Sequence, residues 1–218
     1  MERPQSLNIT PKVAVAVIIL FHAVGFTGLS VAATRPLFLQ LVAWHLLLMM
    51  LVIMLGHDKP NNRFGIFTLV TFLLGFTAEW VGVHTGLLFG NYAYGKTLGI
   101  KLLEIPLMIG VNWFLLIYAV GVTMQRSRLK SAVFRVVTGA AILVLLDLLI
   151  EPVAIRFDYW HWAGGIIPIK NYICWFLVSV LMLGIFEWFK FKKQSKAAPV
   201  LLITEFVFFG ALNLAVML

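Results

Sequence analysis

Long apolar runs separated by short groups of polar residues are the dominant pattern along the chain. Each run is close to the roughly 20 residues that a helix needs to cross a bilayer, and Gly, Pro and charged residues separate one run from the next. The two longest connections, 85–104 and 152–170, are too short to hold a soluble domain. The pattern predicts an all-α polytopic membrane bundle of about seven helices, with residues 1–218 forming a single integral membrane domain. The predicted segments are 13–34, 36–56, 64–84, 105–125, 132–151, 171–189 and 198–218.

The composition excludes an ordinary water-soluble fold. Apolar residues make up 61% of the chain and charged residues 12%, whereas soluble domains have about 45–50% and about 25%. The single cysteine, Cys174, cannot form an internal disulfide and indicates nothing about the compartment. The net charge of +8 comes from basic residues at segment ends, so no nucleic-acid partner is expected.

The basic residues divide unequally between the two sides of the membrane. When alternate connections are placed on opposite sides, twelve of the seventeen Lys and Arg residues fall on the side of the N-terminus. The positive-inside rule then predicts a protein of the inner cell membrane with a cytoplasmic N-terminus and an external C-terminus. Ser30-Val31-Ala32 resembles a signal cleavage site. We expect the first segment to be retained because its apolar run exceeds that of a signal peptide.

Acidic residues inside apolar segments are costly, and most of them lie in the outer half of the predicted spans. Glu79 is near the end of the third segment, and Asp147 and Glu151 close the fifth. Asp147 and Glu151 are four residues apart and therefore share a helix face. Two adjacent carboxylates in a low dielectric cannot both ionise cheaply, so one is expected to hold a proton that it can donate. Pro152 is expected to end this helix directly after Glu151.

Structural roles are the alternative for the same residues. Asp147 could pair with Arg156 and only fix packing, and Glu104 could favour the N-terminus of the fourth segment. Either role would remove that carboxylate from the candidate chemistry.

Further ionisable residues lie toward the cytoplasmic half or in the middle of the spans. Glu187 and Glu205 are expected to pair with the basic run Lys190–Lys196. His22 and His45 are expected to be hydrogen-bonded core residues, with a shared proton path as the alternative.

Two motifs rich in glycine and aromatic residues flank the outer acids. Trp and Tyr collect at membrane interfaces in any case, and Asn171 is a natural N-cap for the sixth segment. Aromatic faces also stabilise cations, so acids, histidines and aromatics from several segments on one leaflet favour a chemical site. The first motif is Glu79-Trp80-Val81-Gly82-Val83-His84-Thr85-Gly86 with Phe89-Gly90-Asn91-Tyr92-Ala93-Tyr94, and the second is Asp158-Tyr159-Trp160-His161-Trp162 with Asn171-Tyr172 and Trp175.

Three other membrane chemistries lack their required residues. The five histidines do not form the paired clusters of a di-iron oxygenase, and the seventh segment has no lysine for a retinal Schiff base. Metal-dependent prenyl transfer would need aspartate-rich clusters, which are absent from the sequence. No metal is therefore expected.

The motifs also form a recognisable set: Glu79-x2-Gly82-x3-Gly86, Phe89-Gly90-x-Tyr92-x-Tyr94, Pro106 before Trp113, Asp147-x3-Glu151-Pro152, Trp160-x-Trp162 and Pro168-x2-Asn171-x3-Trp175. This set, over about residues 65–190, resembles the membrane-integral carotenoid hydratases. That family includes γ-carotene and lycopene 1,2-hydratases and bisanhydrobacterioruberin hydratases. It favours Asp before the proline, where this chain has Glu151.

The resemblance implies an enzyme of carotenoid biosynthesis that adds water to the terminal C=C of a linear carotenoid by acid catalysis, without a cofactor. The implied partners are the lipophilic carotenoid, the lipid bilayer and other enzymes of carotenoid biosynthesis. Asp147 or Glu79 would protonate the alkene, and Glu151 or His161 would position water. The expected catalytic residues are Glu79, Asp147, Glu151 and His161, and the expected substrate-binding residues are Trp80, His84, Tyr92, Tyr94, Trp113, Trp160, Trp162, Asn171 and Trp175.

A membrane transporter or binding protein for a small lipophilic or proton-coupled solute is the alternative. Transporters often have inverted repeats and polar groups that serve both leaflets. In this sequence the polar groups concentrate on one side and no repeat is evident, which favours the enzyme.

Overall fold

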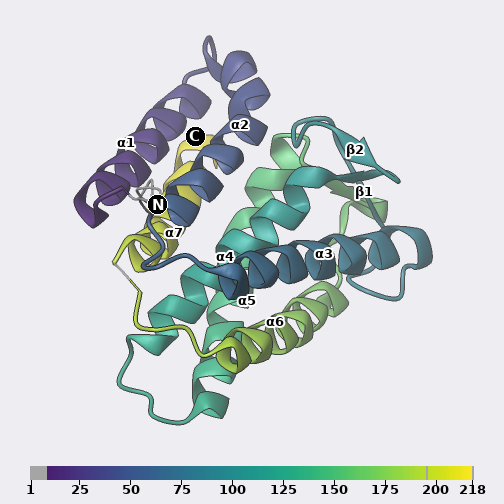
Figure 1. Ribbon diagram of the computed structural model, residues 1–218. Coiled ribbons are helices and arrows are strands. Elements are labelled where there is room, and N and C mark those ends of the chain that lie inside the picture. Colours follow the sequence, from purple (N-terminus) through teal and green to yellow (C-terminus); the bar gives the residue numbers. More distant parts are fainter. Residues whose placement is uncertain (1–8, 195, 218) are drawn as a thin grey trace.

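The computed structural model describes residues 9–194 and 196–217, and within this part seven long helices form a bundle (Figure 1). All seven are long and apolar enough to cross a membrane, so the prediction of an all-α membrane bundle is confirmed. The helices are α1 (Pro11–Ser30), α2 (Arg35–Leu55), α3 (Asn62–Thr85), α4 (Leu107–Gln125), α5 (Ala132–Arg156), α6 (Ile169–Phe189) and α7 (Ala197–Met217).

Local sequence signals set several helix ends. The side chain of Thr10 accepts a hydrogen bond from a backbone N–H in the first turn of α1. Asn61 caps α3 in the same way, with its Oδ1 3.1 Å from the backbone nitrogen of Phe64. At the other end of α3, Gly86 has a φ of 62°, the left-handed conformation that suits glycine at a helix C-terminus.

The fifth helix continues past Pro152 to Arg156, so the prediction that it ends at Glu151 is wrong. Proline lacks an N–H and crowds the preceding turn, which weakens the helix at that point. In the same region, Nδ2 of Asn213 in α7 donates a hydrogen bond to the carbonyl of Leu149 at 2.7 Å. This hydrogen bond connects α7 to α5 in the turn before the proline.

α4 lies at the centre of the bundle. It packs against α2, α3, α5, α6 and α7, and most of its residues are buried. In Figure 1, α1, α2 and α7 form one group of helices, and α3 and α6 lie on the other side of α4. α4 can therefore contribute residues to sites on both of its sides.

The two long connections meet in a small sheet that the sequence analysis did not predict. Strand β1 (Tyr92–Tyr94) pairs antiparallel with β4 (Trp160–Trp162), and the 3₁₀ turn η1 (Ala163–Gly165) follows β4. A second pair joins β2 (Lys101–Leu102) and β3 (Ile105–Pro106). Because side chains alternate along a strand, the first and third residues of β1 and of β4 lie on one face of the sheet.

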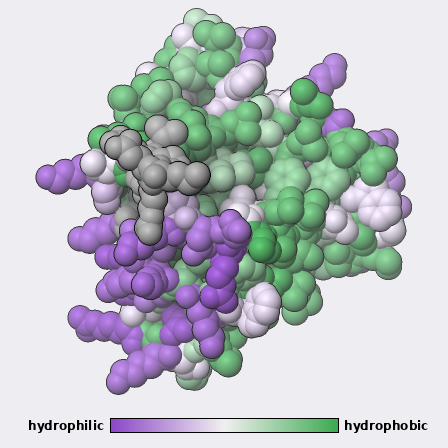
Figure 2. Space-filling model, in the orientation of Figure 1, coloured by the Kyte–Doolittle hydropathy of each residue, from purple (hydrophilic) through white to green (hydrophobic). Residues whose placement is uncertain are grey.

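The surface divides into a charged end and an apolar belt. Figure 2 shows hydrophilic side chains gathered at the end where α4 is joined to α5 and α7 begins, and hydrophobic side chains over much of the rest of this face. Large apolar residues on the helices are exposed, including Trp44 (69%) and Leu177 (58%). Such a surface is expected for a protein embedded in lipid. Arg3, one of the twelve basic residues on the N-terminal side, lies outside the described residues.

Candidate active site

Glu79 of α3 is buried and receives hydrogen bonds on both carboxylate oxygens. The hydroxyls of Tyr92 and Tyr94 in β1 donate to Oε2 at 2.5 and 2.7 Å. Nε1 of Trp113 in α4 donates to Oε1 at 3.0 Å. Three neutral donors surround this carboxyl group, which therefore acts as an acceptor.

Two glycines of α3 make this arrangement possible. A Cβ atom at Gly75 would lie 2.5 Å from the nearest atom of Trp113, and one at Gly82 would lie 2.6 Å from Oη of Tyr92. The two glycines are about one helical turn before and after Glu79, on the same face of α3. The partners of Glu79 can approach because these positions carry no side chain.

Burial raises the pKa of both tyrosines of β1, and the neighbouring carboxyl of Glu79 raises it further. The hydroxyls of Tyr92 and Tyr94 therefore keep their protons and remain donors across the physiological pH range.

Asp147 and Glu151 of α5 face the same side, as their spacing predicted, and Asn171 of α6 connects them. Its Nδ2 donates to Oδ2 of Asp147 at 2.8 Å and to Oε1 of Glu151 at 3.2 Å. Oε2 of Glu151 accepts from Nε1 of Trp160 at 3.0 Å and from Nε1 of Trp162 at 2.8 Å. Oδ1 of Asp147 is buried without a hydrogen-bond partner in the described part of the chain.

Two of the structural alternatives for these residues do not hold. α6 begins at Ile169 after Pro168, so Asn171 lies inside the first turn and its amide binds the carboxyl groups instead of capping the helix. Within the described residues Asp147 forms no ion pair with Arg156.

A small chamber of about 20 Å³ lies among these groups. A cavity of about 10–15 Å³ is large enough to hold a single water molecule, provided that the water has two to four polar partners. Asp147 is not part of the chamber wall. The lining comprises nine of the predicted site residues, Glu79, Tyr92, Tyr94, Trp113, Glu151, Trp160, Trp162, Asn171 and Trp175, together with Phe89, Ile109 and Asn112, which were not predicted.

Three predicted site residues lie away from the chamber. Trp80 is 38% exposed, and its ring is 5.3 Å from that of His84. The imidazole of His84 faces the exposed carboxylate of Glu104 at 3.4 Å. His161 occupies the middle of β4, so it points away from the face that carries the tryptophans, and its Nε2 is 2.6 Å from Oδ1 of Asp158.

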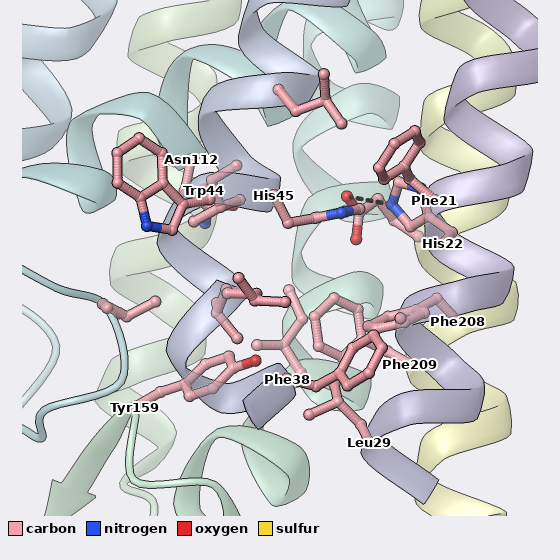
Figure 3. Close-up of a pocket in the computed structure, with 18 of the residues that line it drawn as sticks. Phe21, His22, Leu29, Phe38, Trp44, His45, Asn112, Tyr159, Phe208 and Phe209 are labelled. Atoms are coloured by element: carbon pink, nitrogen blue, oxygen red, sulfur yellow. Dashed lines mark hydrogen bonds and ion pairs between the residues drawn. The ribbon is translucent and has the colours of Figure 1, made fainter. Parts of the chain in front are cut away.

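A larger cavity of about 310 Å³ adjoins the chamber, with walls from α1, α2, α4 and α7 (Figure 3). Most of its lining is aliphatic or aromatic. It shares Ile109, Asn112 and Trp160 with the chamber. One end of an apolar molecule in the large cavity would therefore lie against the wall of the chamber.

The prediction that Glu205 and Glu187 pair with the basic run Lys190–Lys196 is wrong. Glu205 lines the large cavity and its Oε1 is 3.3 Å from Nε2 of His22. Glu205 lies about 12 Å along α7 from the start of that helix, beyond the reach of the Lys190–Lys196 run. Glu187 pairs with Arg135 at 2.6 Å instead of with the lysines. Within the described residues, no three His, Cys, Asp or Glu side chains are placed to hold a metal ion together.

Seven apolar helices that bury carboxyl groups and aromatic residues beside an apolar cavity define an integral membrane protein with a candidate site for a lipophilic molecule. Residues 16–218 match the model of the family described as "Carotenoid biosynthesis protein". The chain belongs to this family, which confirms the resemblance inferred from the motifs.

A curated relative is the bisanhydrobacterioruberin hydratase of Haloarcula japonica. It is 28% identical over 170 residues, which cover 71% of this chain and 57% of that protein. The chain therefore spans little more than half of the length of this relative. No solved structure matches the chain.

Proposed function

We propose that this protein hydrates the terminal C=C bond of a linear carotenoid and so produces a tertiary alcohol. The observation that carries the proposal is the adjacency of two spaces, a water-sized chamber lined by carboxyl groups and an apolar cavity that shares part of its wall. The family of the chain supports a role in carotenoid biosynthesis, and the name of its hydratase relative supports hydration as the reaction.

The substrate end would enter the large cavity and reach the shared wall. Trp160 lines both spaces, and its indole N–H is held by Glu151. An aromatic face at this position can stabilise a tertiary carbocation by about 0.5–2 kcal/mol. Trp160 would therefore orient the end group and stabilise the cation that forms there.

The proton would come from the Asp147 and Glu151 pair. Asp147 has a buried oxygen without a partner, and an anionic oxygen in that state is costly, so Asp147 is suited to carry the shared proton. Glu151 is the member of the pair that lines the chamber and would present the proton to the alkene. The C=C π electrons form a C–H bond with that proton at the less substituted carbon, and the other carbon becomes the tertiary cation.

Water in the chamber would complete the addition. One oxygen lone pair of the water forms the C–O bond to the cation, and the water loses a proton to a carboxylate. Glu79 is assigned this role because it is the other carboxyl group that lines the chamber, and both of its oxygens already act as hydrogen-bond acceptors. Transfer of the proton back to the Asp147 and Glu151 pair restores the starting state. The reaction consumes only alkene and water, so activity should survive dialysis and chelation.

The proposal is tested by expressing the protein in cells that accumulate lycopene and separating the pigments by chromatography. The wild type should form hydroxylated lycopene. Asp147→Asn and Glu151→Gln should lower the rate of product formation by about 10²–10⁴-fold, which is the usual effect of losing a general acid. Glu187→Gln is the matched control because it changes a carboxylate paired with Arg135, away from both spaces.

Each contrary result has a definite meaning. If cells that express the wild-type protein form no hydroxylated pigment, whether lycopene or γ-carotene is supplied, hydration of linear carotenoids would be excluded. An equal loss in Glu187→Gln at equal protein level would exclude the chamber as the site. Full activity of Asp147→Asn would make Glu79 the preferred acid. Glu205→Gln is unsuitable as a control, because Glu205 lines the large cavity.

A further inference from the structure

The large cavity has a polar end that the hydration reaction does not use. His22 of α1, His45 of α2 and Glu205 of α7 line it, and each lies near the middle of its helix. The two imidazole rings are 4.6 Å apart and nearly perpendicular. Figure 3 shows them at one end of the cavity, with Phe38 and Tyr159 toward the other end. Three ionisable residues at this depth in a membrane protein indicate a functional site.

The hydrogen bonds of His22 fix the charge of this group. Its Nδ1 lies 2.8 Å from the carbonyl oxygen of Ile18, and because a carbonyl only accepts, Nδ1 carries a hydrogen. Its Nε2 lies 3.3 Å from Oε1 of Glu205, so one proton lies between these two atoms. The pair is neutral overall whichever atom holds that proton, which makes its burial less costly than that of a single charge.

Of these three residues, two have a hydrogen-bonding group that remains available to a ligand. Within the described part of the chain, Oε2 of Glu205 has no hydrogen-bond partner, and neither ring nitrogen of His45 has one. Both residues line the cavity. Oε2 of Glu205 is an acceptor, and the neutral imidazole of His45 offers one N–H donor. A hydroxyl group, which donates one hydrogen bond and accepts others, complements both.

We propose that the large cavity binds an isoprenoid chain that carries a hydroxyl group, with the hydroxyl held between Glu205 and His45. The isoprenoid nature of the chain rests on the proposed function, whereas the recognition of the hydroxyl does not. The cavity lining extends from His22 to Leu29, about 10 Å along α1, and Tyr159, the chain neighbour of the shared-wall residue Trp160, lies toward the end away from the histidines (Figure 3). A short isoprenoid alcohol would therefore place its hydroxyl at the polar end and its isopropylidene end beside Trp160.

The proposal is tested by equilibrium binding of two radiolabelled probes to the purified protein in lipid nanodiscs. The probes are all-trans-farnesol and its methyl ether, which has the same chain but cannot donate a hydrogen bond. Empty nanodiscs correct for partition into the lipid. The wild type should bind the alcohol about tenfold more tightly than the ether, the difference expected for one hydrogen bond to a charged or strongly polar acceptor.

Variants then assign the preference to the polar end of the cavity. Glu205→Leu should bind the two probes with equal affinity, and Glu187→Leu, which alters a carboxylate outside the cavity, should keep the tenfold preference. Should Glu205→Leu fail to fold, His45→Phe provides a second test, because it removes the N–H that donates to the oxygen atom of either probe and keeps an aromatic ring; it should weaken the binding of both probes. Equal affinities in the wild type, an unchanged preference in folded Glu205→Leu, or unchanged affinities for both probes in His45→Phe, would overturn the proposal.

The outcome is independent of catalysis. Asp147→Asn should lose carotenoid hydration and keep the preference for the alcohol. A wild-type protein that prefers farnesol but hydrates no carotenoid would support the binding site and exclude the proposed function. A protein that hydrates lycopene but does not discriminate between the probes would exclude only the hydroxyl site.

Discussion

At the scale of single residues, neutral donors surround the carboxyl groups of the candidate site. Tyr, Trp and Asn side chains supply every hydrogen bond to Glu79, Asp147 and Glu151, and within the described residues none of the three forms an ion pair. Without a neighbouring cation, three buried negative charges would repel one another in a low dielectric. This environment favours retention of at least one proton in the group, as acid catalysis requires.

Asp158 gives a prediction that concerns the loops alone. The hydrogen bond from His161 lowers the pKa of Asp158, and a hydrogen bond from the backbone N–H of Lys96 contributes as well. Because the folded pKa lies below the unfolded value of about 3.9, Asp158 stabilises the protein above that pH, and the contribution is lost as the pH falls through the folded pKa. Asp158→Asn should therefore lower the melting temperature at pH 7, and the difference from wild type should shrink below about pH 4.

Thermal unfolding in detergent, followed by circular dichroism from pH 3 to pH 7, would measure this. Glu104→Gln, a change in another exposed loop carboxylate, serves as the control. A difference between Asp158→Asn and wild type that stays constant over the whole range would contradict the assignment to ionised Asp158.

The acids of the site could be predicted from the sequence because burial of a carboxyl group is costly wherever it occurs. Glu79, Asp147 and Glu151 were identified in this way. Asn112 was missed because an amide in an apolar helix is far less conspicuous than a charge. The partner of Glu205 was mispredicted because proximity to lysines in the sequence says little about which helix faces α7.

At the scale of elements, close contacts between α3 and the loops hold the site together. A methyl group at Gly82 would lie 2.6 Å from Oη of Tyr92 and 2.9 Å from a ring carbon of Phe89. Gly82→Ala should therefore move Tyr92 away from Glu79. Overpacking of this kind typically costs about 1–3 kcal/mol of stability, and the formation of hydroxylated carotenoid should fall as well.

Gly184→Ala provides the matched comparison. Gly184 also lies within a long helix, but a Cβ there meets nothing within 4 Å. The change should stabilise the protein slightly, by about 0.5–1 kcal/mol, because alanine is the better helix former. Melting temperatures would compare the stability of the two variants, and pigment chromatography would compare their formation of hydroxylated carotenoid. If Gly82→Ala matched Gly184→Ala in both measurements, α3 would not be packed against β1 as described.

The length of the apolar runs was sufficient to locate the middle of each helix, whereas helix ends depended on contacts that the sequence does not reveal. α5 passes Pro152 in a region where Asn213 of a helix distant in sequence binds the backbone. The strands β1 and β4 have three residues each, too few for a periodicity argument. Their spacing, Tyr92-x-Tyr94 and Trp160-x-Trp162, was nevertheless a signal for one aromatic face.

At the scale of the whole molecule, the two ends of the bundle differ in chemistry. The candidate site lies at the end formed by the two long connections, where β1 meets β4. The opposite end carries most of the basic residues, including the connection 126–131 between α4 and α5 (Figure 2). Positive-inside topology would place this basic end in the cytoplasm and the candidate site in the outer half of the membrane.

Reporter fusions to the intact chain test this orientation. With seven spans and a cytoplasmic N-terminus, alkaline phosphatase fused after Leu218 should be active, because it folds only outside the cytoplasm. Green fluorescent protein at the same position should stay dark when the chain is exported by the general secretory route. The reverse pattern is expected for both reporters inserted between Arg128 and Leu129, since that connection is on the basic side.

Bright fluorescence at the C-terminus together with active phosphatase at Arg128 would show that the orientation is the opposite one, with the carboxyl groups of the site in the cytoplasmic half. Bright fluorescence at both positions would instead contradict the count of seven spans, because the three helices α5, α6 and α7 should separate the two reporter positions and place them on opposite sides of the membrane.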